Sequence, residues 1–302
     1  MPSTMTAASI VTPLLEHSAE NRPLRTLLAM RQDHPAASPR LARALGASQI
    51  VAQRIKLGHE AVGSGLRFTS ARDAIEQSGY RVVHSVAVAC VVVDGLALED
   101  SWPEHAAFWT WAFTHATIAS ILAEAAKRHE DAAFSATLLR NVGHLLIERS
   151  HPEARVVIRE HVFRGASHVE AEQTTLGFTH LDVMRELADG WGLDEGVMPV
   201  FDEQPERGSV GRVFWKAKRS LHREGVHDAF DPIDLPPEPL DLELHELILA
   251  SGGIRGVLSW SAGYIASAFL HGDVADTFPV ESIAPHVTEN RSQDDEEHSA
   301  VA

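Results

Sequence analysis

Apolar residues recur at intervals of three and four along most of the chain, as at Ile118, Ile121 and Leu122. This spacing places them on one face of a helix, whereas a half-buried strand would alternate at every second position. The pattern therefore predicts an all-α protein.

The segment from Val82 to Val93 is rich in β-branched residues, a composition typical of buried strands. The helical patterns on both sides and the lack of partner strands outweigh this weak propensity, so we expect a helix. Cys90, the single cysteine, lies in this apolar run. We assign it to the core rather than to an exposed nucleophile.

Helix ends and prolines divide the chain. Ser38 and Pro39 suit the start of a helix and Gly46 its end, while four prolines between residues 230 and 242 exclude a continuous helix there. The ends of the chain are poor in large apolar residues. We expect a disordered N-terminus (1–12) and a helical domain (13–229). A proline-rich connection with C-terminal helices follows (230–280), and these helices either pack on the domain or stand apart. The chain ends in a disordered acidic tail (281–302).

The formal net charge is −16 at pH 7. Binding to a phosphate backbone requires clustered Lys and Arg that displace counterions, so this charge argues against nucleic acid as a partner. No apolar run approaches the roughly eighteen residues of a membrane span, and the N-terminus lacks the regions of a signal peptide. We therefore expect a cytoplasmic protein that does not bind membranes.

Five motifs occur in a fixed order along the chain. They are the helix from Ala42 to Ala61, Thr69 to Gly79, Phe108 to Ala112, Ala133 to Leu145, and Glu170 to Trp191 with its Leu176-Gly177 and His180. Their order resembles the HDOD family, the HD-related output domain of bacterial regulators. The resemblance implies a helical bundle related to the HD phosphohydrolases, a regulatory role and signalling proteins as partners.

The resemblance also implies where a related hydrolase would hold its metal. Trp111 replaces a histidine there, and Arg140-Asn141 replaces the His-Asp pair. Divalent metals need convergent nitrogen and oxygen ligands. An indole offers none, a guanidinium repels a cation and an amide is a weak ligand. We expect no metal, no cofactor and no catalytic residue, with Arg140 as a fixed cation in the former cavity, paired with an acidic or carbonyl partner.

The chain contains eighteen histidines, which leaves a relocated metal site as an alternative. Its candidate ligands are His115, His144, His168, His180, Glu148, Glu170 and Glu172. His115 and His144 each lie four residues beyond a lost ligand position, on the same helix face. Ordinary histidines bonded to the backbone are the simpler explanation, and we favour it.

Two aromatic segments are further candidates for ligand or partner contacts. Phe108, Trp109, Trp111 and Phe113 form the densest aromatic cluster; Trp109, Trp111 and Phe113 cannot all point to one side of a helix, so one of them, with Trp109 as a candidate contact, is expected to face a groove or a neighbouring element. Trp215, Lys216, Lys218 and Arg219 form an aromatic and basic patch in an acidic protein. Core packing and a solvated helix face are the alternatives.

The sequence thus predicts a non-catalytic signal-transduction module that binds signalling proteins in trans or a small anionic ligand, to which His115, His144 and His180 are further candidate contacts. An alternative is a metal-dependent HD-type phosphohydrolase with a rearranged His and carboxylate site. A nucleotide sensor is a third reading, based only on the general association of the HDOD family with such pathways. Nucleophile elbows, phosphate loops and His-Glu-x-x-His motifs are absent from the sequence.

Overall fold

The computed structural model describes residues 6–19, 37–46, 70–78, 80–95, 106–127, 130–193, 195, 197–202, 206 and 209–223. Within these ranges the chain forms helices and turns and contains no strand, which confirms the predicted all-α fold. The expectations for residues 230–302 and for the helix beyond Gly46 concern parts of the chain outside the described residues.

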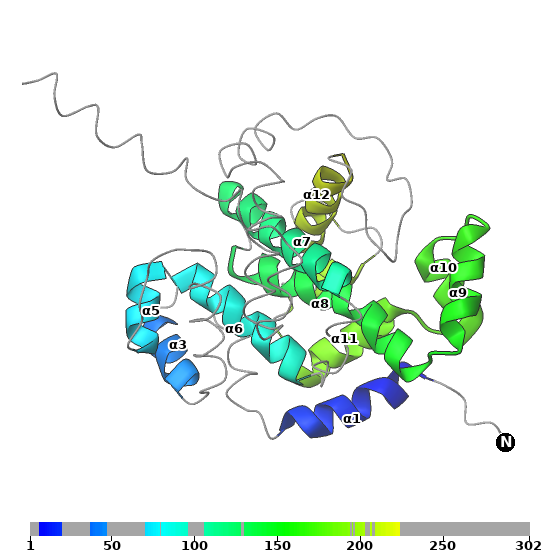
Figure 1. Ribbon diagram of the computed structural model, residues 1–302, viewed down its shortest axis with the longest axis horizontal. Coiled ribbons are helices and arrows are strands. Elements are labelled where there is room, and N and C mark those ends of the chain that lie inside the picture. The colour runs from blue at the N-terminus through cyan, green and yellow to red at the C-terminus, as the bar shows by residue number, and fades with distance from the viewer. Residues whose placement is uncertain are drawn as a thin grey trace, which may run out of the picture.

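Two long helices, α7 (Ala106–Ala125) and α8 (Glu130–Ser150), pack along each other at the centre of the molecule (Figure 1). The helix α12 (Val210–Arg223) lies against α7, whereas α6 (Tyr80–Gly95) and α11 (His180–Trp191) lie against α8. Apolar side chains of α7 and α8 are buried on several faces, because each helix has neighbours on more than one side.

Shorter helices surround this centre. The helices α3 (Ala37–Gly46) and α5 (Ala71–Ser78) pack together beside α6, and α9 (Ala154–Phe163) and α10 (His168–Leu176) form a pair at the opposite end of the molecule (Figure 1). A short 3-10 helix, η2 (Met198–Phe201), contacts α8, α11 and α12.

The N-terminal segment is helical earlier than expected. The helix α1 (Ala7–Ala19) packs on α11, with Ala7, Ile10 and Val11 buried. The prediction of disorder over residues 1–12 is therefore wrong for residues 7–12. These three apolar residues have the three-and-four spacing of a helix face, and α11 supplies the surface that buries them.

Two helix predictions are confirmed. The β-branched segment 82–93 lies inside α6, where contacts with α8 and α5 override the strand propensity. The helix predicted from Ser38 and Pro39 is α3, which begins at Ala37 and ends at Gly46. Among the described helices, none is both long enough and apolar enough to cross a membrane.

Candidate functional site

Arg140, which the resemblance to the HD phosphohydrolases places at the histidine of their His-Asp pair, has a buried side chain. Its Nη1 donates hydrogen bonds to the main-chain carbonyl oxygens of Val200 and, at 3.0 Å, of Asp202. Its guanidinium carbon lies 4.5 Å from the ring centroid of Phe214 and 5.2 Å from that of Trp215, which are cation–π distances. Arg140 is therefore a buried cation whose hydrogen bonds go to carbonyl groups, one of the two kinds of partner expected.

His115 uses both of its ring nitrogens in the core. Nε2 lies 3.0 Å from the carbonyl oxygen of Phe214, and Nδ1 lies 3.2 Å from the amide nitrogen of Asn141. Since a carbonyl oxygen only accepts, Nε2 carries the proton and Nδ1 accepts a hydrogen bond from the amide. Trp111 packs on the same imidazole, with 5.0 Å between ring centroids.

The residues at the former metal position do not fit a metal ion. Trp111 has no donor atom for one, Arg140 is a cation, and the amide nitrogen of Asn141 donates to His115. All three side chains are buried and packed, so this position is part of the core. We therefore derive no catalytic step through a metal here.

A second group of polar side chains is buried one helical turn further along α8. His144 comes from α8, His168 and Glu172 from α10, and His180 is the first residue of α11. Their exposed fractions are 8% for His144, 8% for His168, 1% for Glu172 and 4% for His180. We call these four residues the histidine cluster.

Glu172 is the centre of the histidine cluster. Its Oε1 lies 3.2 Å from Nδ1 of His144 and 3.8 Å from Nε2 of His168, and its Oε2 lies 2.7 Å from Nδ1 of His180. The rings of His144 and His180 are 3.7 Å apart between centroids and tilted by 32°. Three helices thus present their donor atoms to one carboxylate.

Capping residues set the positions of α10 and α11. Ser167 and Glu170 form a capping box at the start of α10, and Thr179 and Asp182 form another at the start of α11. Gly177, with φ of 81°, ends α10 in the left-handed conformation that glycine adopts without strain. The two helices are therefore joined by a tight connection that brings their facing ends together.

Gly143 lets the start of α11 lie directly on α8. A Cβ at this position would lie 2.9 Å from the main-chain oxygen of His180 and 2.7 Å from Cγ of Met184. A larger residue would push the two helices apart, because the interior has no space to absorb it. The glycine next to His144 is thus what brings His180 into the histidine cluster.

The carboxyl group of Glu172 is ionised. Burial raises its pKa, but the charge of His180 and the hydrogen bonds from His144 and His180 outweigh burial and hold the pKa well below its usual range. The main-chain N–H of His180 also donates to Oε2 at 2.8 Å, as an amide at a helix N-terminus can.

The pKa of His180 departs from its usual value. Burial lowers its pKa, and although Glu172 raises it, the net pKa lies below the usual value; the charges of Arg140 and His168 contribute to the lowering. The Nδ1–H of His180 donates to the carboxylate of Glu172. The histidine cluster thus surrounds one carboxylate with imidazole nitrogens.

The structure separates the other predicted ligands from the histidine cluster. His115 is bonded to Phe214 and Asn141, as described above. Glu148 forms an ion pair with Arg155 at the end of α8. Glu170 is exposed, and its capping role lowers the pKa of its carboxyl group. Of the seven candidate ligands, the four in the histidine cluster therefore share one site.

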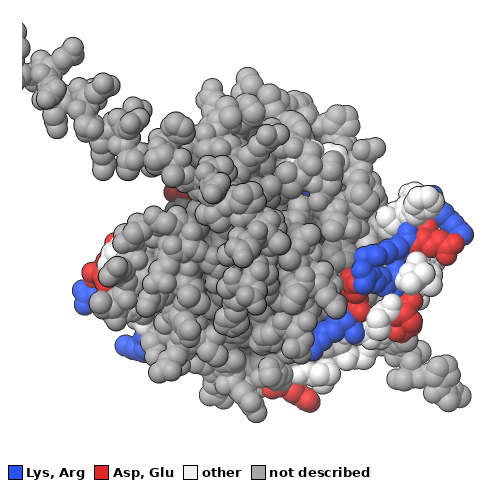
Figure 2. Space-filling view, viewed as in Figure 1, with Lys and Arg blue, Asp and Glu red and all other residues white. Residues whose placement is uncertain are grey.

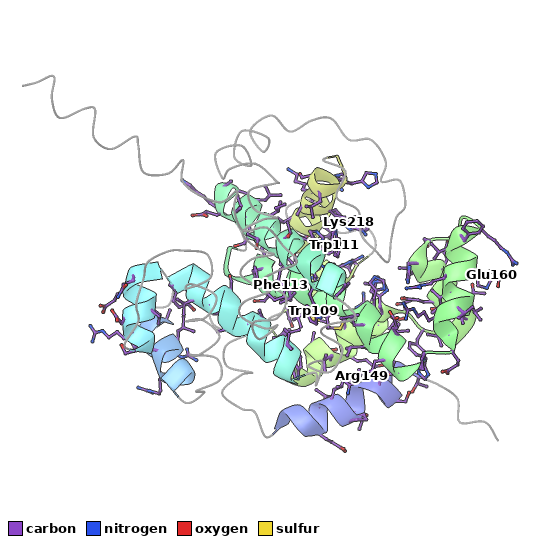
Figure 3. All side chains as sticks on the ribbon, viewed as in Figure 1. Trp109, Trp111, Phe113, Arg149, Glu160 and Lys218 are labelled. Atoms are coloured by element: carbon purple, nitrogen blue, oxygen red, sulfur yellow. The ribbon has the colours of Figure 1, made fainter. Side chains whose placement is uncertain are left out.

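The aromatic cluster on α7 packs against neighbouring elements. Phe108, Trp109, Trp111 and Phe113 are all buried, and Figure 3 places the last three along α7. Neighbouring helices, α8 and α12 among them, pack on α7, so Trp109 is not exposed for a ligand or partner.

The basic patch on α12 is also less exposed than expected. Lys218 is buried, with Nζ 5.4 Å from the ring centroid of Trp215, and Trp215, Lys216 and Arg219 are half-buried. The physical reason is the packing of α12 against α7, α8 and η2.

Some residues of these sites were not identified from the sequence. The carbonyl groups of Val200 and Asp202 that hold Arg140 are main-chain groups, and residue types give no signal for them. Glu172 was only a candidate ligand, yet it is the centre of the histidine cluster. Its position relative to Leu176-Gly177 and His180, in the last of the five motifs, is the signal that could have identified it.

The profile of the HDOD domain matches residues 60–205. A search of curated proteins finds no relative of this chain. Three solved structures are similar. An HDOD domain protein of unknown function from Geobacter sulfurreducens is 17% identical, with a TM-score of 0.55 over 91% of this chain and 100% of the other.

A protein from Shewanella amazonensis SB2B, provisionally named a phosphohydrolase, is 16% identical, with a TM-score of 0.58 over 85% of this chain and 98% of the other. A protein from Marinobacter aquaeolei VT8, provisionally named a signal transduction protein, is 17% identical, with a TM-score of 0.55 over 87% of this chain and 68% of the other. These identities establish the fold alone. Residues 60–205 of this chain therefore form an HDOD domain, and the three structures share its helical fold.

Proposed function

We propose that this chain is a non-catalytic regulatory module of bacterial signal transduction, which acts in the cytoplasm by binding partner proteins. The observation that carries this proposal is the buried Arg140, clamped by the carbonyl oxygens of Val200 and Asp202 where a hydrolase needs a metal ligand. A fixed cation at that position opposes metal-activated water.

The domain match supports a regulatory role, because HDOD domains are output domains of regulators. The name of the Marinobacter aquaeolei protein points in the same direction. A small anionic ligand is a weaker alternative for this chain, since Lys218 of the basic patch is buried.

The α9–α10 pair offers a surface for such a partner. On α9, Val156 is 71% exposed and Phe163 is 92% exposed, and both lie on one face of the helix, seven residues apart. Charged side chains of both signs lie over the α9–α10 pair (Figure 2). Exposed apolar residues with a polar rim are typical of protein contacts.

Partner capture tests this proposal. The full chain and its Val156→Ser/Phe163→Ser variant would be crosslinked in native cells and the captured proteins quantified. We expect a signalling protein that the wild type captures and the variant loses, while the matched control Arg159→Ser, on the same exposed helix, keeps it. Equal capture by all three chains would contradict this choice of surface.

The histidine cluster favours a second candidate function, a phosphohydrolase with a rearranged site. Its burial argues against catalysis, because a substrate must reach the metal. The hollow of about 570 Å³ beside it is lined by residues of α10, α11 and the η2 segment, including Glu170, Asp182 and Arg185, and by none of the four cluster residues.

A hydrolysis assay separates the two functions. The full chain would be incubated with phosphodiesters and nucleotides in the presence of Mg²⁺, Mn²⁺, Fe²⁺ or Zn²⁺. We expect the substrates to stay intact. Turnover that disappears in the His144→Ala variant would establish the hydrolase instead.

A further inference from the structure

The donor atoms of the histidine cluster have the spacing of a metal site. Zinc binds imidazole nitrogens and carboxylate oxygens at about 2.0–2.2 Å, so neighbouring donors of a tetrahedral set lie about 3.3 Å apart. The distances from the Glu172 oxygens to the donor nitrogens are 2.7 Å for His180, 3.2 Å for His144 and 3.8 Å for His168. The donor atoms of Glu172, His144 and His180 all lie within 4.8 Å of one another.

The chemistry of the donors also fits. Glu172 provides a carboxylate and three histidines provide imidazole nitrogens, a combination that suits zinc and its neighbours among the divalent transition metals. Nδ1 of His144 and Nδ1 of His180 face this carboxylate. A metal bound there would take their lone pairs once the ring protons had moved to Nε2.

We propose that His144, Glu172 and His180, with His168 as the fourth donor, bind one divalent transition-metal ion of the zinc type. This inference goes beyond the regulatory function proposed above. It also replaces the expectation of no metal, which rested on the broken ligand set at Trp111, Arg140 and Asn141.

The burial of the four donors makes this a closed site. Structural zinc sites use four protein ligands, whereas catalytic sites keep a position open for water or substrate. Because the ligands come from α8, α10 and α11, the metal ties α10 to the centre of the molecule. The ion therefore stabilises the position of the α9–α10 pair and does not hydrolyse a substrate.

Arg140 opposes the metal. It lies close enough to His180 for its positive charge to act on that imidazole. Its Nη1, however, is bound to the carbonyl oxygens of Val200 and Asp202, and the ionised Glu172 lies between the histidines. The anion among the donors thus favours a cation in spite of the arginine.

The test uses the full chain, purified without a polyhistidine tag or chelators. Isothermal titration with Zn²⁺ is expected to give one equivalent per chain. Co²⁺ is expected to give the intense visible absorption of a tetrahedral ion, without the sulfur-to-metal charge transfer that Cys90 would produce. Absence of stoichiometric Zn²⁺ binding, or the weak spectrum of octahedral Co²⁺, would overturn the proposal.

Variants locate the ion. We expect His144→Ala and Glu172→Gln each to lower the affinity for Zn²⁺ by at least about 100-fold, because the loss of even an outer-shell partner costs about 10- to 100-fold. The matched control His161→Ala, on α9, should bind as the wild type does. Unchanged affinity in the first two variants, or loss in the control, would overturn the assignment.

Circular dichroism would show whether each variant folds. If the cluster variants fail to fold, the wild-type Zn²⁺ stoichiometry and Co²⁺ spectrum decide alone. Turnover by the zinc-loaded chain would overturn the regulatory function but not the metal site. If the chain binds no zinc but still captures its partner, the metal site would be overturned and the regulatory function would stand.

Discussion

Arg140 on α8 donates a hydrogen bond to the main-chain carbonyl of Val200, sixty residues further along the chain. Asp202 accepts a second hydrogen bond from the same Nη1. One side chain therefore fastens the η2 segment to the central helix. Arg140 thus makes a structural contact between α8 and the η2 segment.

Replacing Arg140 with Ala should lower the free energy of unfolding by about 2–3 kcal/mol, the scale of hydrogen bonds from a charged group to buried acceptors. Arg185→Ala is the matched control, because Arg185 also donates to this segment, at the carbonyl of Phe201, but its side chain is 41% exposed. The Arg185→Ala variant should lose less than about 1 kcal/mol of its free energy of unfolding. Denaturant unfolding measures both, and equal losses would contradict a buried clamp.

Gly143→Ala should lower the free energy of unfolding by about 1–3 kcal/mol, the usual cost of overpacking. The new Cβ would meet the main-chain oxygen of His180, which cannot move without shifting α11. Gly190→Ala is the control. Its Cβ meets only the end of the half-buried Leu15 side chain, which can rotate away, so thermal unfolding should show a much smaller effect.

Thr179→Ala should lower the free energy of unfolding by about 1 kcal/mol, the usual value of a helix N-cap. The Thr179 hydroxyl accepts a hydrogen bond from the main-chain N–H of Asp182 at 3.2 Å. Thr179→Ser keeps this oxygen and should keep the stability in chemical denaturation. If both variants lost the same stability, the methyl group rather than the cap would be responsible.

Ser167→Ala should have a similar cost of about 1 kcal/mol through α10. The Ser167 hydroxyl accepts from the main-chain N–H of Glu170 at 3.1 Å. Because α10 carries His168 and Glu172, we also expect faster amide hydrogen exchange in this helix, measured by mass spectrometry. Exchange unchanged in α10 but faster in α11 would contradict this assignment.

The sequence predicted local features well. The location of α3 and the helical state of segment 82–93 followed from residue types and their neighbours. The loss of the metal ligands at Arg140-Asn141 followed from the chemistry of those side chains. Such features depend on a few consecutive residues, so one sequence is enough to predict them.

Contacts between helices were harder to predict. Spacing placed His144 one turn beyond Arg140, but it gave no means of pairing His144 with Glu172 on another helix. That pairing depends on Gly143, which lets α11 approach α8. For the same reason the sequence could not decide whether Trp109 faces a groove or a neighbouring helix, since helix periodicity says nothing about what covers α7.

The packing of α1 on α11 means that α1 is synthesised well before the surface that buries it. About 160 residues separate the two helices. At the usual 5–20 residues per second, the ribosome needs about ten to thirty seconds to complete the surface that covers Ile10 and Val11. During that interval these side chains are exposed to chaperones and to other nascent chains. The N-terminal helix therefore docks only after the HDOD domain has been translated almost to its end.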